Sequence, residues 1–299
     1  MRKAGVAAFA PAKVNLWLRV TGRREDGYHL LDSLVVFAEA GDVVHVAPAA
    51  ALSLLVDGPF AAAVPEGEDN LVLRAATMLR DAAARHPHPL PQGEGQGEGV
   101  FTAMGANLHL TKALPPASGI GGGSSDAAAT LRALTHLWAL DPALGERIAP
   151  GLGADVPVCL RAEPCRMRGI GEVLEPVPTL PDCGIVLANP KIPLETRSVF
   201  AARGGPFSAP FPPGSWADAA ALAAEIRAAG NDLRQAAISL CPAVADVLGA
   251  LAALPGALCA EMSGSGATCF ALFGSAAAAR QAAATLPAAW WRWGGGLLR

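Results

Sequence analysis

The chain has 299 residues, of which 52% are hydrophobic and 16% charged, and this balance excludes a disordered protein. Its 23 basic and 26 acidic residues give a net charge of −3, so no basic field indicates a nucleic-acid partner. Mean hydropathy is positive at +0.34, but the longest apolar runs are interrupted by glycine and proline and fall short of the about 20 residues of a membrane-spanning helix. We therefore expect a soluble protein of roughly two domains.

The six cysteines form no C-x-x-C pair and have no histidine at metal-ligand spacing. They are typical of small core residues in a reducing compartment, without zinc or disulfides. The basic start M-R-K is followed by an apolar stretch at the short limit for a signal peptide, so we expect a first strand there. These features predict a cytoplasmic protein.

The first half of the chain mixes strands and helices. Alternating apolar residues predict a β-rich opening, at 13–20, 31–38 and 42–47. A helical period predicts a helix over 70–84, with Asp69 as its N-cap. Residues 86–99, rich in Pro, Gly, Gln and Glu, are expected to form a flexible insertion whose His86 and His88 are exposed rather than metal ligands.

A strand at 106–111 is followed by a glycine-rich stretch and a helix at 124–140. A helix near 145–151 precedes G-A-D-V-P-V-C-L, which we expect to form a turn and a short buried strand. In the second half, helices are predicted at 216–229, 232–239, 242–253 and 275–284, and strands at 184–188, 257–262 and 267–273. We place the domain boundary near residue 165, which gives domains 1–164 and 165–299.

The segment P-P-A-S-G-I-G-G-G-S-S lies between a strand and a helix. Its glycines permit positive φ, and successive backbone N–H groups ahead of a helix N-terminus form an anion site that suits a polyphosphate. The spacing fits neither a Walker A loop nor a Rossmann fingerprint, and the alternative is a flexible turn. The candidate ATP-binding residues are Pro115, Pro116, Ala117, Ser118, Gly119, Ile120, Gly121, Gly122, Gly123, Ser124 and Ser125. Ser124 and Ser125 could cap the helix or bind phosphate or Mg²⁺, and Ser125 is the candidate Mg²⁺ ligand.

This segment resembles the phosphate loop of the GHMP kinase superfamily, which includes galactokinase, homoserine kinase and mevalonate kinase. Two further superfamily motifs occur in order, A-P-A-K-V-N-L at 10–16 and S-G-S-G-A at 263–267. D-G-Y-H at 26–29 and G-A-D-V-P-V at 153–158 are similar to one branch, the 4-diphosphocytidyl-2-C-methyl-D-erythritol kinases. E-D-N-L at 68–71 and G-N-D-L at 230–233 complete the likeness, which spans nearly the whole chain.

The resemblance implies an α+β, two-domain GHMP-kinase fold. Its N-terminal domain would be like the second domain of ribosomal protein S5, its C-terminal domain a ferredoxin-like α/β domain, and its active site the cleft between them. It also implies transfer of the ATP γ-phosphoryl, with Mg²⁺, to the 2-hydroxyl of 4-diphosphocytidyl-2-C-methyl-D-erythritol in the non-mevalonate (MEP) isoprenoid pathway. We expect only small-molecule partners, no membrane, and a monomer or weak homodimer.

Two alternatives stay open. One is another GHMP small-molecule kinase, of homoserine or mevalonate type. The other is an inactive nucleotide-binding homologue, which the presence of both Lys13 and Asp155 disfavours.

Lys13 and Asp155 are the candidate catalytic residues. The turn around Asp155 can hold its carboxylate as a general base, although an aspartate that only hydrogen-bonds its own turn would look the same. Lys13 on its strand can stabilise phosphoryl charge, whereas the alternative is a surface lysine. The family match favours catalysis for both. Asn15 projects from the same strand face as Lys13 and could orient the substrate.

Tyr28 and His29 are candidates for stacking on and hydrogen-bonding to cytosine. The resemblance implies a second aromatic residue, mapped to Phe200, which could equally be a core residue on a helix. Thr196, near the start of that helix, is either an N-cap or a substrate contact. Gly264, Ser265 and Gly266 are expected to form a second phosphate loop, a reading compatible with a hairpin turn.

Two features have no assigned function. Asn231 and Asp232 could cap the helix that follows, and the sequence gives no further role. The W-W-R-W cluster at 290–293 is either packing or an association surface.

Overall fold

The computed structural model describes residues 5–65, 67–85 and 104–298, so the insertion predicted at 86–99 lies outside the described residues. The chain divides into two compact units. Unit 1 comprises residues 1–10, 42–113 and 123–160, and unit 2 comprises residues 11–41, 114–122 and 161–299. Two of the boundaries between the units fall inside long strands, one in β1 (Val6–Arg23) and one in β2 (His29–Ala49). The single boundary near residue 165 and the cleft stay predictions.

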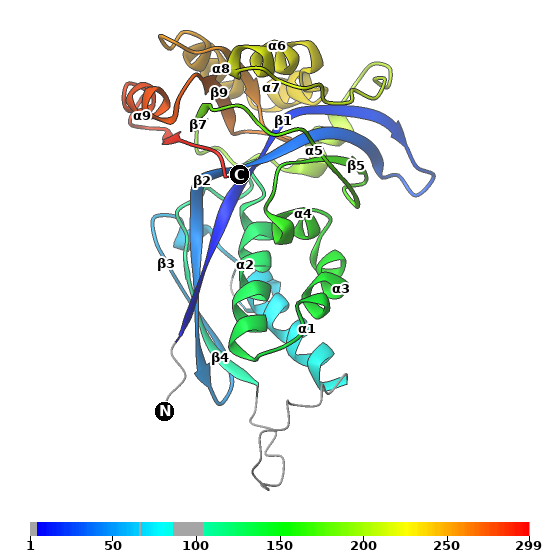
Figure 1. Cartoon of the computed structure of the whole chain (residues 1–299), viewed down its shortest axis with the longest axis vertical. Helices are drawn as coiled ribbons and strands as arrows, with labels where there is room; N and C mark the ends of the chain where they lie inside the picture. Colours follow the sequence, from blue (N-terminus) through cyan, green and yellow to red (C-terminus); the bar gives the residue numbers. More distant parts are fainter. Residues whose placement is uncertain (1–4, 66, 86–103, 299) are drawn as a thin grey trace, which may run out of the picture. The chain divides into compact units, whose positions relative to one another are not determined.

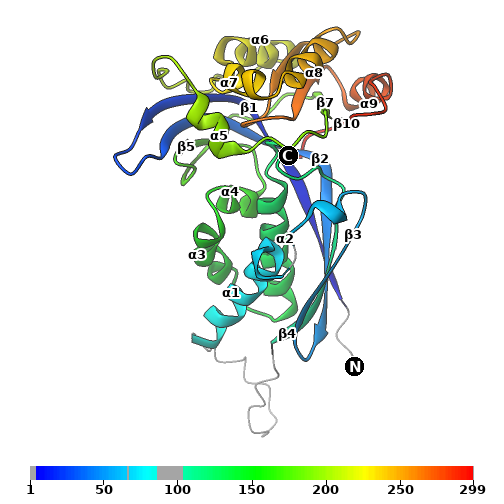
Figure 2. The same cartoon turned by 180° about the vertical axis from the view of Figure 1, so that it is seen from behind.

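Unit 1 has strands with helices on one side (Figures 1 and 2). The end of β2 pairs antiparallel with β4, and β4 pairs parallel with β3. The remaining elements are β3 (Leu52–Asp57), α1 (Leu71–Arg85), β4 (Gly105–Thr111), α2 (Gly122–Leu137), α3 (Pro142–Leu152) and α4 (Val156–Arg161), with 3₁₀ turns at Ala61–Ala63 and Gly67–Asp69. Helix α1 forms because its apolar residues recur at helical spacing, which gives it a buried face: Val72, Ala75, Ala76, Leu79, Ala82 and Ala83.

Two predictions for unit 1 are wrong. The N-cap of α1 is Asn70, whose Oδ1 accepts the Val72 N–H at 2.8 Å, whereas Asp69 ends a 3₁₀ turn. Residues 156–161 form helix α4 rather than a buried strand. A short apolar run fits either structure, and Pro157 lies in the first helical turn, where its missing N–H would have no helical partner.

Unit 2 contains an antiparallel sheet in the order β10-β7-β9-β8, and the first part of β2 pairs with β5, which pairs with β6. The strands are β5 (Cys165–Gly169), β6 (Val173–Pro176), β7 (Gly184–Asn189), β8 (Cys259–Met262), β9 (Cys269–Phe273) and β10 (Trp291–Gly295). The helices are α5 (Thr196–Ala202), α6 (Ala219–Ala229), α7 (Arg234–Leu240), α8 (Ala243–Ala252) and α9 (Ala276–Ala284).

Strand β7 is the centre of the unit 2 core because both of its faces are buried. Val186 and Ala188 belong to a cluster with α7, α8 and α9, whereas Ile185 and Leu187 belong to a second cluster with β1 and α6. Trp290 packs against the first cluster, and Trp291 and Trp293 pack against the second. The tryptophans therefore contribute to packing, as one of the two readings of W-W-R-W predicted.

A buried ion pair fastens an irregular segment of unit 2. Asp32, only 1% exposed, accepts two hydrogen bonds from Arg166 at 2.8 and 2.7 Å. It also accepts the Phe211 N–H at 2.7 Å, and the Phe211 ring meets Trp17 edge-on with centroids 5.6 Å apart. One carboxylate thus joins β2, β5 and the proline-rich stretch before α6.

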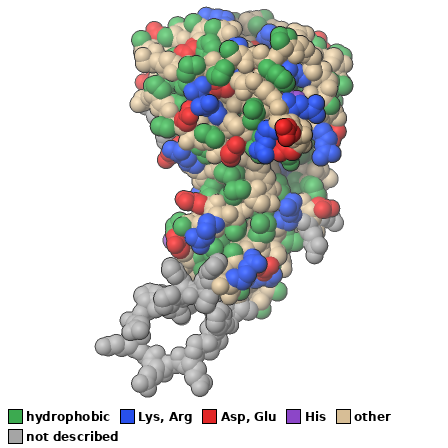
Figure 3. All heavy atoms as spheres, turned by 90° about the vertical axis from the view of Figure 1, so that its right-hand side faces the viewer, with side chains coloured by type: hydrophobic (Ala, Val, Ile, Leu, Met, Phe, Trp, Pro, Cys, Tyr) green, Lys and Arg blue, Asp and Glu red, His purple; other side chains and the backbone are tan. Residues whose placement is uncertain are grey.

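Across the described residues, no helix is long and apolar enough to cross a membrane. On the face drawn in Figure 3, acidic and basic side chains are interspersed, so that face carries no patch of a single sign.

Candidate active site

The glycine-rich segment turns sharply before α2. Backbone φ is positive at Ala117 (47°), Gly119 (76°) and Gly121 (62°). Helix α2 begins at Gly122 rather than at the predicted Ser124, so Ser124 lies in its first turn. The first turn of a helix has N–H groups without helical partners. The segment therefore has the form expected of an anion site.

A second turn, residues 263–267, interlocks with this segment inside unit 2. Ser263 Oγ donates to the Gly119 carbonyl oxygen at 3.0 Å, and the Thr268 N–H donates to the Ser118 oxygen at 3.0 Å. A Cβ atom on Gly119 would come within 2.5 Å of the Ser263 carbonyl oxygen, so only glycine fits there. Thr196 Oγ1 lies 2.9 Å from Ser265 Oγ, which brings Thr196 to the second turn.

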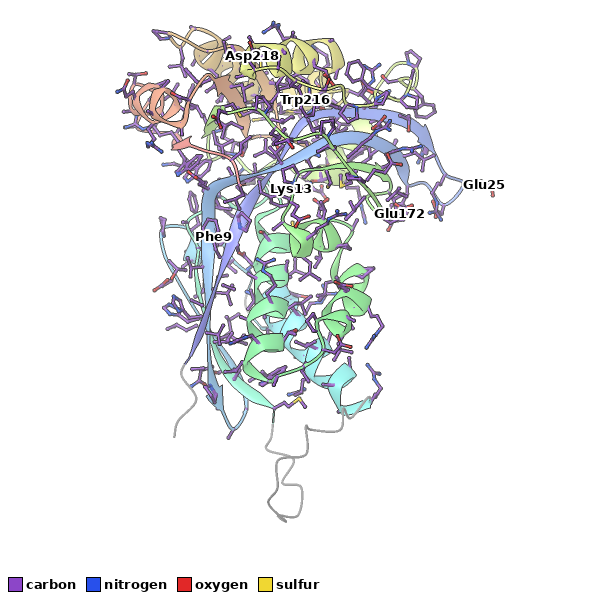
Figure 4. The ribbon with its side chains drawn as sticks, viewed as in Figure 1. Phe9, Lys13, Glu25, Glu172, Trp216 and Asp218 are labelled. Atoms are coloured by element: carbon purple, nitrogen blue, oxygen red, sulfur yellow. The ribbon has the colours of Figure 1, made fainter. Side chains whose placement is uncertain are left out.

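Lys13 lies on β1 (Figure 4) and is buried, at 4% exposure, so it is not the surface lysine of the alternative reading. Its N–H donates to the Ile120 oxygen at 3.0 Å, and its Nζ donates to Asn15 Oδ1 at 3.3 Å. A Cβ on Gly121 would lie 3.1 Å from Lys13 Cε. The glycine-rich segment and the aliphatic part of the Lys13 side chain therefore lie in close contact.

Asn15 connects this lysine to its surroundings. Its N–H donates to Ser263 Oγ at 3.1 Å, and its Nδ2 donates to Ser33 Oγ at 2.7 Å. Ser33 and Ser263 had no role in the sequence-based assignment. Ser263 stands in the S-G-S-G-A motif. No local sequence pattern indicates a role for Ser33, because its role comes from a hydrogen bond to Asn15 on another strand.

The proposed cytosine residues also lie in unit 2. The His29 and Phe200 rings stack with centroids 5.0 Å apart and planes at 28°, and Tyr28 is 60% exposed. Phe200 also packs against the core, so both readings of it hold in part. Burial, and then the guanidinium groups of Arg23 and Arg203, lower the pKa of His29. A neutral imidazole at neutral pH can both donate and accept a hydrogen bond.

Asp155 belongs to unit 1, where it immediately precedes α4 and is half-buried. Its carbonyl oxygen accepts the Cys159 N–H at 3.1 Å, which places the residue at the start of the helix. Ser125, in the first turn of α2, is fully buried. The pairing of Asp155 with Lys13 joins residues of different units and stays a prediction.

Unit 1 also holds a buried charged triad. Lys112 Nζ lies 2.5 Å from Asp42 Oδ2 and 2.6 Å from Asp126 Oδ2, and all three side chains are buried. Burial raises the pKa of Asp126 to about 7, against the opposing attraction of Lys112. The triad ties the first half of α2 to β2 and to the end of β4. Lys112 follows a strand directly, but nothing local in the sequence predicts its two partners.

Among the described residues, no group of three or more histidine, cysteine or acidic side chains is placed to hold a metal ion. Mg²⁺ that accompanies a nucleotide takes most of its ligands from phosphate and water and needs only one or two protein oxygens. Ser125 offers a hydroxyl oxygen in the first turn of α2, and its role as a Mg²⁺ ligand stays a prediction.

Comparison with known proteins identifies the class. The chain matches the GHMP kinases N terminal domain over residues 70–163 and the GHMP kinases C terminal domain over residues 214–291. The crystal structure of a homoserine kinase from Cytophaga hutchinsonii shares the fold, with a TM-score of 0.65 at 18% identity over 99% of this chain and 95% of that one. The two-domain α+β fold is therefore that of a GHMP kinase, an ATP-dependent phosphotransferase.

Closer relatives narrow the class. A 4-diphosphocytidyl-2-C-methyl-D-erythritol kinase of Paramagnetospirillum magneticum is 51% identical over 94% of this chain and 95% of its own length. The corresponding enzyme of Granulibacter bethesdensis is 49% identical over 98% and 94%. A crystal structure of 4-(cytidine 5'-diphospho)-2C-methyl-D-erythritol kinase superimposes with a TM-score of 0.75 at 34% identity, covering 98% and 99% of the two chains. The chain belongs to this kinase family.

Proposed function

We propose that the protein transfers the γ-phosphoryl group of ATP to the 2-hydroxyl of 4-diphosphocytidyl-2-C-methyl-D-erythritol, a step of the non-mevalonate route to isoprenoid precursors. The observation that carries the substrate assignment is the His29–Phe200 stack beside the exposed Tyr28, in the unit that also holds Lys13. Aromatic side chains of this kind offer a stacking surface for a base.

In this proposal the oxygen of the substrate's 2-hydroxyl attacks the γ-phosphorus of ATP, and Asp155 accepts the proton of that hydroxyl. The bond between that phosphorus and the β–γ bridging oxygen breaks, and ADP leaves. The Lys13 ammonium and the amides of the glycine-rich segment stabilise the charge that develops on the phosphoryl oxygens. Asn15 supports the substrate and orients Lys13, to which it is hydrogen-bonded at 3.3 Å.

Mg²⁺ bound with ATP would neutralise phosphate charge, and Ser125 would be its protein ligand. The residues for cytosine are Tyr28, His29 and Phe200, with Thr196 and the second turn near the phosphate end. The cysteines, free thiols in the structure, support a reducing cytoplasm. We propose a monomer or weak homodimer.

A coupled ADP-release assay tests the function. With Mg-ATP and 4-diphosphocytidyl-2-C-methyl-D-erythritol we expect turnover, whereas homoserine and mevalonate should give none. Asp155→Asn should lower kcat by at least about 100-fold, because general-base catalysis contributes at least that much, while leaving ATP binding intact. Turnover on mevalonate instead of the cytidyl substrate, or a wild-type rate in Asp155→Asn, would overturn the substrate or the base, respectively.

A further inference from the structure

Asn231 follows Gly230 at the end of α6, and the residue is buried, at 8% exposure. Its Nδ2 donates two hydrogen bonds to the second turn, to the Met262 oxygen at 2.8 Å and to the Gly264 oxygen at 2.9 Å. Its Oδ1 accepts the Leu233 N–H at 2.9 Å. The N-cap of α7 is Leu233, without a side-chain cap, so the prediction that Asn231 caps this helix is wrong. Its Oδ1 instead holds the turn before α7, while the other end of the amide serves the second turn.

The second turn needs such support because glycine leaves its backbone free to adopt several conformations. Gly264 and Gly266 both have positive φ, at 56° and 84°. In a planar trans peptide the C=O and the following N–H point in opposite directions. Holding the Gly264 oxygen towards Asn231 therefore turns the Ser265 N–H away from it. Among the described residues, this N–H donates to no acceptor.

Asn231 is itself fixed to β1. The Leu18 N–H donates to the Gly230 oxygen at 3.1 Å, and the Asp232 N–H donates to the Leu18 oxygen at 2.9 Å. The same strand carries Lys13 and Asn15, and Asn15 donates to Ser263 Oγ. Residues 230–232 are thus hydrogen-bonded to the strand of the proposed catalytic lysine, and Asn231 within them is hydrogen-bonded to the second turn.

We propose that Asn231 is a positioning residue that aims the Ser265 amide at the phosphoryl group in transfer. The inference rests on the proposed function, because it takes the second turn as the site of that phosphoryl group. Only a side chain with two donors and one acceptor on one planar group satisfies both carbonyl oxygens and the Leu233 N–H together. This requirement explains an asparagine rather than a serine or aspartate, either of which could accept the Leu233 N–H alone.

Two variants separate the two ends of the amide. Asn231→Ser keeps an acceptor for the Leu233 N–H but replaces the two Nδ2 donors by one hydroxyl on a shorter side chain. Asn231→Asp places a carboxylate oxygen against two carbonyl oxygens. We expect kcat to fall by about 100-fold in each, the usual loss of one preorganised donor. The KM for the cytidyl substrate should change little. Asp218→Ala is the matched control: it removes the N-cap at the other end of α6 (Figure 4), where Asp218 accepts the Ala221 N–H at 2.8 Å, and should leave kcat unchanged.

A second readout does not depend on turnover. Amide hydrogen exchange is followed at Ser265 with Mg²⁺ and a non-hydrolysable ATP analogue, and we expect slowed exchange in the wild type but not in the Asn231 variants. The inference would be overturned if both variants kept the wild-type kcat, or if the loss of kcat equalled the fraction of unfolded protein. It would also be overturned if the Ser265 amide were equally protected in the wild type and the variants. If the wild type shows no turnover but its Ser265 amide is protected in a way that depends on Asn231, the proposed substrate is contradicted. The positioning role is then still supported.

Discussion

Gly119→Ala should damage the junction between the two glycine turns. The new Cβ would lie 2.5 Å from the Ser263 oxygen, 2.7 Å from the Gly266 oxygen and 2.8 Å from the Gly266 nitrogen. Contacts below 3.0 Å essentially never occur for a Cβ atom, so the turns must separate by about half an ångström. All three obstructing atoms belong to the backbone, and no side chain can rotate out of the way.

The expected cost has two parts. Overpacking of this kind costs about 1–3 kcal/mol, and a side chain at the left-handed φ of 76° adds about 1–2 kcal/mol. We therefore expect the free energy of unfolding to fall by about 2–5 kcal/mol. A misplacement of 1 Å can lower a rate by about 100-fold, so half that shift should lower kcat by about 10-fold.

Urea unfolding and the ADP-release assay measure the two effects. Gly249→Ala is the control, because Gly249 lies in α8 with nothing within 4 Å of the added Cβ, and alanine should stabilise that helix by about 0.5–1 kcal/mol. If Gly119→Ala unfolds at the wild-type urea concentration and turns over within about 2-fold of wild type, the close contact between the two glycine turns determines neither stability nor kcat.

Three further predictions concern other sites. Arg166→Met should lower the free energy of unfolding by about 3–5 kcal/mol, because it leaves the buried Asp32 carboxylate without its cation; a loss below about 1 kcal/mol in urea unfolding would contradict this. The raised pKa of Asp126 means that the folded protein binds that proton more tightly than the unfolded chain, so the free energy of unfolding should fall as pH rises from about 4 to 7. Asp126→Asn should flatten that fall in urea unfolding at successive pH values, and an unchanged slope would refute the assignment. Tyr28→Ala should raise the KM for the cytidyl substrate by at least about 5-fold with a small change in kcat, since base stacking contributes about 1–3 kcal/mol, and steady-state kinetics with an unchanged KM would remove the stacking role.

Local signals in the sequence predicted the elements that carry the motifs. The alternation around Lys13 predicted β1, and the glycines before Ser124 predicted the turn that leads into α2. Short apolar runs were ambiguous, as at 156–161, because six residues do not distinguish a helix from a buried strand. Strand β5 escaped notice although Cys165 and Met167 alternate with arginines, because five residues make a weak pattern.

The relations between distant residues could not be predicted. Asn231 contacts Met262 and Gly264, and Lys112 contacts Asp42, without any regular spacing that would announce these pairs. A single sequence shows that a residue is polar and where it lies in its own element. It does not show which buried carbonyl oxygens or carboxylates that residue will meet after the chain folds.

The discontinuity of unit 2 has a consequence for the protein during its own synthesis. Strand β1 leaves the ribosome before the other strands of unit 2, yet the residues that bury Leu16 and Trp17 include Phe270 and Leu272. The Leu298 N–H donates to the Phe37 oxygen at 2.8 Å, so a strand from the first segment of unit 2 is hydrogen-bonded to residues more than 250 positions later. Unit 2 therefore cannot close until residues up to 298 have been translated, and until then the nascent chain exposes apolar strands of the kind that chaperones bind. A message truncated before β10 would yield a polypeptide for proteolysis rather than a smaller working enzyme.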